Sequence, residues 1–535
     1  MSAESSRELT SHSGVPLKEL YTPEDIKRLD YERDLGYPGQ PPFTRGVYRT
    51  MYRGQQFTIR RFTGVETPEQ TNELYKEELR LGQNGLAIAP DVPTSTSLDS
   101  DNPRCEGDVG FCGVPIDTVD DMEIIFKDIP IEKVTCWCYT PYITGLYFAM
   151  AEKRGVDLKA LGGTTPAMGI FVPVPVDIPF KVSLDGEIRM AMDFAEWTAL
   201  NVPNWHNTSV SVYGQKDNGM NNIQALGLLI AASVEAADTW KARGRMPLEQ
   251  FFRRISFEMA IANDMFEEIC TLRAARRLWT KVCQERYGLA DRKLMQFRVR
   301  VQTSGCTNAR QEPLNNIIRI AYHMLSGCLG GAQTMHPNGY DEALCIPTDQ
   351  SMLLSIRTLQ ILQDETNVTA VIDPLGGSYY VEWLTGEIEK RAWEYYTKIE
   401  GMGGICKATR SGFFVNEYKK ANLDWDEKVD SGERVVIGVN KYRMKPEDVP
   451  YNVPIYRFKP TAGQEKIAKL KKYKMKRDNA AVKAALKRLE KSCLSEDENI
   501  FEYLVRAYRA GATLQEGTDV CRKVYGLDTV QLMKL

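Results

Sequence analysis

The chain alternates between short runs of β-branched and aromatic residues and longer segments in which apolar residues recur three and four positions apart. The short runs are typical of buried strands, and the longer segments are typical of amphipathic helices. The pattern predicts eight strands, at residues 85–91, 134–140, 164–172, 208–214, 254–260, 297–302, 331–335 and 369–373. Helices are predicted among them at 119–128, 144–155, 187–201, 221–243 and 314–327.

Strands that alternate with helices form parallel sheets, because each helix returns the chain to the same edge of the sheet. Eight such units favour a (β/α)8 TIM barrel with insertions, and periodicity alone leaves a doubly wound open sheet as the alternative. Active sites of a barrel lie at the carboxyl ends of the strands and in the loops that follow. We therefore expect chemistry in four segments, at residues 92–95, 213–214, 302–305 and 333–336.

The chain divides into three predicted parts. Residues 1–40 are rich in proline and lack periodicity, which predicts an extended N-terminal arm of the kind that holds partners. Residues 41–445 are the predicted substrate-binding barrel, and residues 446–535 are a linker followed by a C-terminal helical segment. Within the last part, residues 465–491 carry eleven Lys or Arg against three acidic residues, which predicts either a solvated helix face or a surface for an acidic partner.

Composition narrows the function classes. The 535 residues are 43% hydrophobic, with a formal net charge of −3 and a pI near 6.1, so the basic surface that nucleic-acid binding requires is absent. Residues 1–13 are polar, and the apolar stretch 225–237 is too short to span a bilayer, so we expect a cytoplasmic protein with no membrane partner. Twelve scattered cysteines include one close pair, Cys136 and Cys138, which we interpret as buried reduced thiols and not as a metal site.

Four motifs carry a family resemblance: Tyr48-Arg49-Thr50-Met51, Thr58-Ile59-Arg60-Arg61-Phe62, Gly107-Asp108-Val109-Gly110 and Gln302-Thr303-Ser304-Gly305. Together they resemble the catalytic chain of the adenosylcobalamin-dependent acyl-CoA mutases, the methylmalonyl-CoA mutase family. The resemblance covers residues 40–445 and, more weakly, 495–526. It implies the barrel fold and an isomerase that carries out a radical 1,2-rearrangement of an acyl-CoA, because the cofactor supplies the radical and a water-excluding lumen protects it.

The resemblance also implies a path for coenzyme A. Arginine suits the phosphates because its planar fork donates paired hydrogen bonds. Gln55 stands where relatives often carry an arginine, which weakens one phosphate contact. The residues expected to bind the substrate or coenzyme A are Tyr48, Thr50, Met51, Thr58, Arg60, Thr164, Val176, Arg254 and Ser256.

For the cofactor, the resemblance implies adenosylcobalamin, contacted by Ser95, Asp217, Gln302 and Glu342. Relatives supply the cobalt-ligating histidine from an Asp-x-His-x-x-Gly motif, and none of the four histidines here stands in such a motif. We therefore expect no cobalamin-binding domain in this chain. The ligand is expected from a separate small cobalamin-binding subunit, in a heterotetramer of two large and two small subunits.

The acyl pocket departs from the family pattern. Phe62 stands where relatives carry a tyrosine, and Gly214, after Tyr213, stands where they carry a general-acid histidine. The triplet Thr164-Thr165-Pro166 lacks the family's glutamine, and Val176 falls where an arginine pairs with a substrate carboxylate. The residues assigned to catalysis by position are Phe62, Thr165, Pro166, Tyr213 and Gly214.

A buried carboxylate without its partner costs several kcal/mol, so a methylmalonyl or succinyl group in its usual pose is disfavoured. The smaller, apolar replacements predict a wider pocket for a bulky branched, alicyclic or aromatic acyl group. Arg61 or Arg189 would serve a substrate carboxylate, and the hydroxyl of Tyr213, Thr165 or Ser211 would replace the lost donor. Glu258 is either a pocket residue or an outward-facing helix residue.

Two alternatives stay open. Within the enzyme class, the chain is an isobutyryl-CoA or methylmalonyl-CoA mutase-type large subunit with a rebuilt pocket. In a different class, it is a catalytically silent homologue that binds coenzyme A. Gln302 and Glu342 favour the enzyme, because a mere binder has no use for cofactor contacts.

Overall fold

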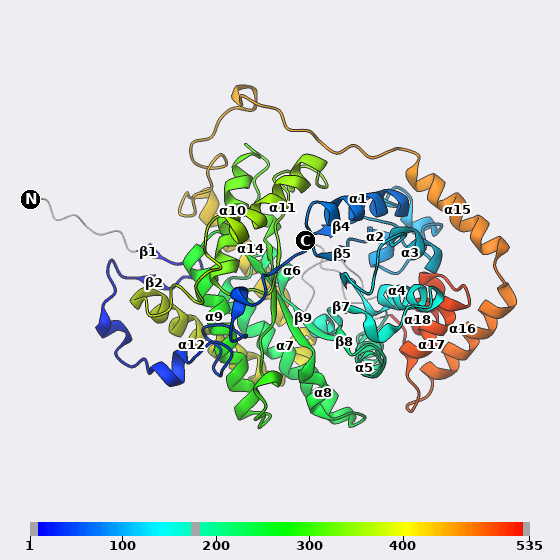
Figure 1. Ribbon diagram of the computed structural model, residues 1–535, viewed down its shortest axis with the longest axis horizontal. Coiled ribbons are helices and arrows are strands. Elements are labelled where there is room, and N and C mark those ends of the chain that lie inside the picture. Colours follow the sequence, from blue (N-terminus) through cyan, green and yellow to red (C-terminus); the bar gives the residue numbers. More distant parts are fainter. Residues whose placement is uncertain (1–8, 173–181, 528–535) are drawn as a thin grey trace, which may run out of the picture. The chain divides into compact units, whose positions relative to one another are not determined.

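The structure is a computed structural model that describes residues 9–172 and 182–527 (Figure 1). It separates into two compact units. Unit 1 comprises residues 1–57, 211–235 and 257–454, and unit 2 comprises residues 58–210, 236–256 and 455–535. The predicted N-terminal arm carries a two-stranded antiparallel hairpin, β1 (Leu9–Thr10) with β2 (Pro16–Leu17), and helical turns at Pro23–Ile26 and Tyr31–Leu35.

Unit 2 contains a parallel sheet whose strands follow chain order. Its strands are β4 (Phe62–Thr63), β5 (Gly85–Ile88), β6 (Thr135–Trp137), β7 (Gly162–Thr164) and β8 (Asn204–His206). The strand register aligns one residue from each strand in a single row: Phe62, Ala87, Trp137, Thr164 and His206. Neighbours in such a row point to the same face of the sheet.

Helices of unit 2 cover the opposite face. They are α1 (Pro68–Arg80), α3 (Val119–Ile125), α4 (Pro141–Lys153) and α5 (Leu184–Asn201), and each begins after a capping Thr or Ser whose side chain accepts a backbone N–H. Trp205, one residue before the end of β8, packs edge to face on Phe148 of α4 at 4.9 Å. Because successive strand residues alternate, the row that contains Trp137 faces away from these helices.

The C-terminal helices belong to unit 2. They are α15 (Ala462–Lys476), α16 (Asn479–Cys493), α17 (Ile500–Arg509) and α18 (Leu514–Tyr525). α17 packs on α4 and α5 through Phe501, which contacts Phe194 and Trp197 edge to face. The predicted helical character of residues 465–491 is confirmed. It is divided between two helices because Asp478 caps the start of α16.

Unit 1 contains the parallel neighbours β10 (Ile255–Ile261, from Phe257 onward), β11 (Val299–Thr303) and β12 (Thr334–His336). α10 (Asn315–Leu329) lies on one face, since a Cβ at its Gly327 would meet Val301 at 2.8 Å and Met335 at 3.2 Å. Other helices of this unit are α9 (Met265–Glu285), α11 (Asp349–Asp364), α12 (Tyr379–Gly401), α13 (Ile405–Arg410) and α14 (Phe413–Asp430).

Several shorter elements, and one long helix, complete the described chain. They are β3 (Thr58–Ile59), α2 (Val92–Ser95), β9 (Thr208–Ser211), α6 (Tyr213–Asp217), α7 (Asn222–Arg243) and α8 (Leu248–Arg253). In the described part of the chain, no helix is both long and apolar enough to cross a bilayer.

The predicted mixed α/β class with parallel strands is confirmed. The described strands form two five-stranded sheets and the short hairpin, and neither larger sheet is closed on itself. The strand predicted at 164–172 is wrong beyond Thr164, because Pro166 has no N–H for a ladder and the chain turns into a 3-10 helix at Ala167–Phe171. β8, with Trp205, was not predicted.

The strand predicted at 369–373 is also wrong, since these residues form turns. Asp373 has a positive φ of 50°, and the N–H of Gly376 donates back to its carbonyl at 3.0 Å. Its carboxylate binds Arg273, and Arg45 Nε donates to it at 3.1 Å. The apolar run at residues 369–373 therefore did not predict the secondary structure correctly. The conformation of this segment is determined by a turn and by the ion pairs of Asp373.

Candidate functional site

A polar cluster lies at the carboxyl end of β11 in unit 1. Ser304 Oγ donates to Asp217 Oδ1, and the N–H of Gly305 donates to Asp217 Oδ2 at 3.4 Å. Tyr213 Oη donates to the carbonyl of Thr303 at 3.4 Å. Tyr213 and Asp217, both predicted from sequence, thus meet the end of the Gln-Thr-Ser-Gly motif.

The electrostatics of this cluster favour neutral groups. Burial raises the pKa of Asp217, while the hydrogen bond from Ser304 opposes that rise. Burial, and then the carboxylates of Asp217 and Glu342, raise the pKa of the Tyr213 phenol well above 10. The phenol therefore stays protonated at neutral pH and acts as a hydrogen-bond donor.

A second network extends across the face of β10–β12 that is turned away from α10. Glu258 on β10 forms an ion pair with Nη1 of Arg300 on β11. Arg300 Nη2 donates to Gln302 Oε1 at 3.0 Å and to His336 Nδ1 at 3.1 Å. Gln302 Nε2 donates to Asn338 Oδ1 at 3.4 Å. All five side chains are at most 7% exposed.

Glu258 is therefore a buried strand residue, and the alternative of an outward-facing helix residue is wrong. Sequence reasoning missed Arg300 as a site residue, and it noted His336 only as the end of a strand. A signal existed in the alternation Arg298-Val299-Arg300-Val301-Gln302, because a charged or polar residue at every second position of a strand indicates a polar face.

The groups around Gln302 fit the cofactor that the resemblance implies. Asn338 is 1% exposed, and its Nδ2 has no hydrogen-bond partner among the described residues. Such a buried amide needs an acceptor, and amide and hydroxyl groups at a strand end suit ribose hydroxyls and amide side chains of a ligand. Glu342 is exposed, just after the buried Asp341.

In unit 2, Ser95 follows β5 as predicted, and its hydroxyl donates to the carbonyl of Val92 at 2.8 Å within α2.

Aromatic rings line the helix-free face of the unit 2 sheet. Phe62 meets Trp137 edge to face, with centroids 4.5 Å apart, and Trp137 lies 5.9 Å from the ring of Tyr139. Thr164 and His206 continue the row across β7 and β8. The structure thus joins the predicted Phe62 and Thr164 to Trp137, Tyr139 and His206, which sequence reasoning did not assign. The available signal was the alternation of side chains between the two faces of the strand predicted at residues 134–140, which places Trp137 and Tyr139 on the same face.

Thr165, assigned to catalysis by position, is fully buried on the helix side. Trp205 Nε1 donates to its hydroxyl at 3.0 Å, and Thr144 Oγ1 lies 2.8 Å from it. Pro166 follows it at the start of a 3-10 helix. Gly214 lies in the first turn of α6, and a Cβ added there would meet no atom within 4 Å. Val176 lies outside the described residues.

Arg60 is a buried cation at the amino ends of two strands. It is 6% exposed, its Nη2 donates to Thr135 at the start of β6, and its Nε has no hydrogen-bond partner among the described residues. A Cβ on Gly85, the first residue of β5, would come within 2.7 Å of Arg60 and 3.0 Å of Thr58. Burial lowers the Arg60 pKa to about 10. This cation lacks an acidic partner in the described chain and suits an anion.

Arg254 lies at the same edge of the unit 2 sheet. Its Nη2 donates to Asn204, the first residue of β8, at 3.2 Å, and its carbonyl is 3.0 Å from His206 Nδ1. The hydroxyl of Ser256, two residues on, is buried and has no partner in the described chain. Two predicted coenzyme A ligands, Arg60 and Arg254, therefore lie at the amino ends of the strands.

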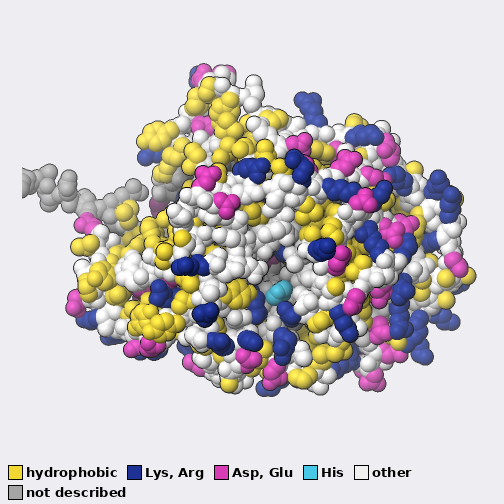
Figure 2. All heavy atoms as spheres, in the orientation of Figure 1, with side chains coloured by type: hydrophobic (Ala, Val, Ile, Leu, Met, Phe, Trp, Pro, Cys, Tyr) yellow, Lys and Arg dark blue, Asp and Glu magenta, His cyan; other side chains and the backbone are white. Residues whose placement is uncertain are grey.

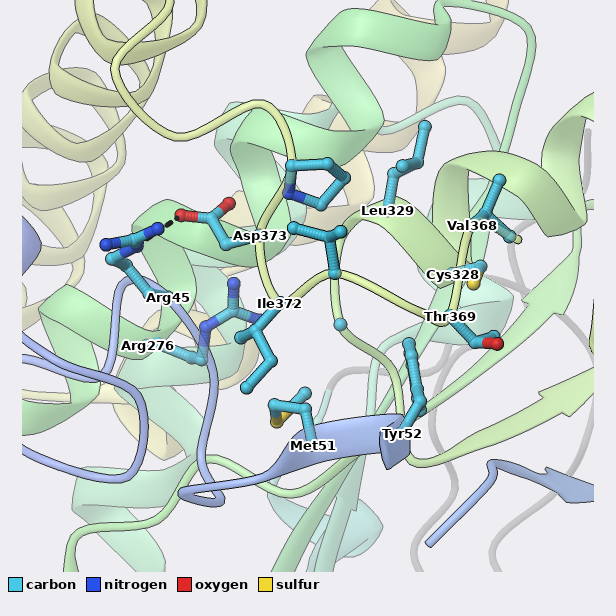
Figure 3. A pocket seen from close by; sticks show the side chains of 13 residues that line it. Arg45, Met51, Tyr52, Arg276, Cys328, Leu329, Val368, Thr369, Ile372 and Asp373 are labelled. Carbon is cyan, nitrogen blue, oxygen red and sulfur yellow. Dashed lines mark hydrogen bonds and ion pairs between the residues drawn. The ribbon is translucent and has the colours of Figure 1, made fainter. Parts of the chain in front are cut away.

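Among the remaining predicted coenzyme A ligands, Thr58 begins β3 in unit 2, whereas Tyr48, Thr50 and Met51 belong to unit 1. Tyr48 and Thr50 are exposed, whereas Met51 is 6% exposed and has a positive φ of 41°. Figure 3 shows Met51 lining a small pocket beside Arg276. Arg276 donates to the carbonyls of Gly330 and Thr44, and burial lowers its pKa to about 10.

Both candidates for a substrate carboxylate partner are used elsewhere. Arg61 is 2% exposed and lies 3.5 Å from Glu78. Arg189 pairs with Asp193 at 3.0 Å and donates to the carbonyl of Glu498 at 2.6 Å. Neither guanidinium is available to a substrate without first losing a structural acid or carbonyl.

The basic C-terminal segment forms ion pairs within unit 2. Lys466 on α15 is 4% exposed, lies 2.9 Å from Asp117 and also binds Asp121. Lys474 lies 2.9 Å from Asp99. Figure 2 shows many Lys and Arg side chains on the surface in the region of α15 and α16. Residues 465–491 thus hold α15 within unit 2 through buried ion pairs, and their other basic side chains form a solvated surface.

The close cysteine pair shares one face of β6 as predicted, with Cys136 and Cys138 sulfurs 3.8 Å apart. Among the described residues, no three His, Cys, Asp or Glu side chains form a group that could hold a metal ion.

Comparison with known proteins gives consistent matches. The sequence profile described as methylmalonyl-CoA mutase matches residues 10–527. Methylmalonyl-CoA mutase of Cereibacter sphaeroides is 38% identical over 527 residues, which cover 98% of this chain and 73% of that protein. The 2-hydroxyisobutanoyl-CoA mutase large subunit of Aquincola tertiaricarbonis is 34% identical over 515 residues, 96% of this chain and 91% of that protein. Human mitochondrial methylmalonyl-CoA mutase is 35% identical over 519 residues, 96% of this chain and 68% of that protein.

Proposed function

Because the chain belongs to the methylmalonyl-CoA mutase family, we propose that it is the large subunit of an adenosylcobalamin-dependent acyl-CoA mutase that rearranges a bulky acyl group. The predicted family resemblance is confirmed, and so is the class of enzyme, since the relatives are named as CoA mutases, which are isomerases. The substrate, the site residues, the cofactor contacts and the partner are proposals, each with its own support.

Coenzyme A binding is proposed for the amino-end edge of the unit 2 strands and for the Tyr48–Met51 segment. The support is Arg60, a buried guanidinium with an unpartnered Nε in the described chain. A cation held in a dry place attracts phosphate strongly, because the surrounding dielectric is low. Arg254 and Ser256 add a second cation and a buried hydroxyl at that edge.

Adenosylcobalamin, when bound, supplies the radical that starts the rearrangement. The residues proposed to contact it are Ser95, Asp217, Gln302 and Glu342. Gln302 is oriented by Arg300 and Asn338, and the protonated phenol of Tyr213 is held at the end of β11. These groups bind and orient, and burial of the network excludes water from that face.

The single observation that carries the substrate proposal is the edge-to-face contact of Phe62 with Trp137. Rings on a sheet face favour branched, alicyclic or aromatic groups through apolar area and ring-to-ring contacts. In unit 1, a Cβ added at Gly214 would meet no atom within 4 Å, so there is room for a larger group beside Tyr213.

A smaller branched acyl group is the second candidate. The relative of which this chain covers 91% is named as the large subunit of a 2-hydroxyisobutanoyl-CoA mutase, and this name favours an isobutyryl-like carbon skeleton. A methylmalonyl-type mutase with a rebuilt pocket and a silent coenzyme A-binding homologue are the outcomes that the experiment below separates from the proposal.

The same relative supports a partner. We propose that this chain works with a small subunit that supplies the cobalt-ligating histidine, in an assembly of two large and two small subunits in the cytoplasm. We also propose that the parallel strands belong to the (β/α)8 barrel that the family resemblance implies.

The decisive experiment reconstitutes this chain with its small subunit and adenosylcobalamin and adds linear, branched, dicarboxylic and aryl acyl-CoA thioesters. We expect a substrate-dependent paramagnetic signal, and an isomeric product by mass spectrometry, with a bulky thioester and not with methylmalonyl-CoA. A signal with methylmalonyl-CoA contradicts the substrate proposal. If no thioester gives a paramagnetic signal or an isomeric product while coenzyme A still binds, the chain is a catalytically silent homologue.

A further inference from the structure

Glu258 and Arg300 are direct neighbours across a parallel strand pair. The register aligns Glu258 with Arg300 and Ala260 with Gln302. The two charged side chains are 4% and 7% exposed and form an ion pair. They point away from α10, on the face of the strands that also bears Gln302.

The other terminal nitrogen of the guanidinium, Nη2, is also engaged. Because arginine only donates, His336 Nδ1 must accept from Arg300 Nη2, which places the imidazole proton on Nε2 and keeps the ring neutral. Gln302 accepts from the same nitrogen at 3.0 Å. The positive charge of Arg300 is thus offset by the carboxylate of Glu258, and the two side chains together carry no net charge.

The position of the pair relates it to the proposed site. Arg300 precedes Gln302 by two residues, about 6.6 Å toward the amino end of the strand. Gln302 is the proposed cofactor contact, and an acyl group must lie close to the cofactor to react. An acyl group that reacts there therefore lies near Glu258 and Arg300, on the same face of unit 1.

We propose that Glu258 is a specificity-determining residue: it serves as an internal carboxylate that occupies Arg300 and so excludes acyl groups that carry their own carboxylate. The inference rests on the proposed function and deepens it by assigning the substrate class, an uncharged acyl group. A second carboxylate here meets the like charge of Glu258 and an arginine already paired, with its own hydration lost.

The charge balance predicts the effect of removing Glu258. Glu258→Gln keeps the size of the side chain and removes its charge, so Arg300 is left as a buried cation without its acid. Such a site attracts an anion. A thioester with a terminal carboxylate, such as succinyl-CoA, then supplies the missing charge.

The test measures binding to the full-length large subunit by titration calorimetry with isobutyryl-CoA, succinyl-CoA and coenzyme A. For the wild type we expect isobutyryl-CoA to bind at least about tenfold more tightly than succinyl-CoA. Glu258→Gln should tighten succinyl-CoA by about tenfold or more and leave coenzyme A unchanged. The double change Glu258→Gln with Arg300→Met should lose that gain, because the cation is gone.

A matched control removes another buried acid from another buried arginine. Glu382 on α12 pairs with Arg273, and both side chains are fully buried. Glu382→Gln should leave the ratio of the two affinities unchanged. Thermal unfolding of each variant checks that it is folded, and the wild-type preference tests the inference even where a variant is unstable.

The outcomes separate the inference from the function on which it rests. Equal affinity of the wild type for both thioesters overturns the inference, and so does an unchanged ratio in folded Glu258→Gln. The inference is also overturned if the tighter binding of succinyl-CoA persists in the double variant, because Arg300 then does not bind the carboxylate of succinyl-CoA. If no thioester and no coenzyme A bind to the wild type, the proposed function itself fails.

Discussion

Phe62 meets Trp137 edge to face, with ring centroids 4.5 Å apart and planes at 83°. The two residues share a row with Ala87 between them, on the face of the unit 2 sheet that its helices leave uncovered. The position at which the family resemblance implies a tyrosine thus presents a ring that packs against a second ring. The pair is the strongest apolar feature of the proposed acyl site.

Replacing Phe62 by leucine should weaken binding of an aryl thioester. An aromatic pair contributes about 0.5–1.5 kcal/mol beyond its buried area, so we expect phenylacetyl-CoA to bind about 2- to 12-fold more weakly, with coenzyme A unaffected. Titration calorimetry measures both ligands. Phe257→Leu is the control, because Phe257 contacts Trp279 at 5.1 Å in unit 1. An equal loss for coenzyme A contradicts the assignment of Phe62 to the acyl group.

Arg60→Gln should weaken coenzyme A binding without destabilising the fold. A hydrogen bond from a charged group contributes about 1.5–3 kcal/mol, so the dissociation constant should rise about 10- to 150-fold. The fold should tolerate the change, because the described chain offers Arg60 no acid and its burial lowers its pKa to about 10. Arg80→Gln, an exposed residue of α1 paired with Glu77, should change neither property. Unaltered affinity in Arg60→Gln would remove Arg60 from the coenzyme A site.

Gly214→His should restore a donor beside Tyr213. A Cβ at Gly214 has no neighbour within 4 Å, so the free energy of unfolding should change by less than about 1 kcal/mol. General acid catalysis contributes about 100- to 10,000-fold, and we expect turnover of a small thioester such as isobutyryl-CoA to rise by at least about tenfold in the reconstituted enzyme.

Gly386→His on α12 is the control for this change, since a Cβ there also meets no atom within 4 Å. It should leave turnover unchanged. No rise in Gly214→His, in a folded protein that still binds coenzyme A, would mean that the space at Gly214 lies away from the reacting group.

Lys466→Met should strongly destabilise unit 2. It leaves the buried carboxylates of Asp117 and Asp121 without their cation, and breaking a buried ion pair costs about 3–5 kcal/mol. Burial lowers the pKa of Lys466, but these two acids outweigh it and raise that pKa above 10.5. The stabilisation is therefore fully present below pH 10.5 and lost only as pH rises beyond it.

Urea unfolding at neutral pH measures this loss. Lys469→Met, one turn along α15, is the control, because Lys469 is 60% exposed and its pair with Glu69 contributes at most about 1 kcal/mol. Equal stability of the two variants would show that the buried pairs do not hold α15.

Much of the site could be predicted because motifs are local in sequence. The segment after β11 could be read as a strand end. Tyr213 and Asp217 are four residues apart on α6, so one helical turn brings both side chains to that end. Partners on separate strands could not be predicted in this way. Glu258, Arg300 and His336 are far apart in sequence, and only the register brings them together.

The sequence alone was sufficient for the family and for the parallel α/β class, because motif residues and apolar periodicity are properties of the chain itself. Tertiary structure decided the direction in which side chains point. Thr165 turns to Trp205 because alternation along β7 directs it toward the helices, and Glu258 faces Arg300 because the strand register aligns them. A one-residue shift in either strand would turn the side chains of that strand to the opposite face, and no local pattern specifies the register.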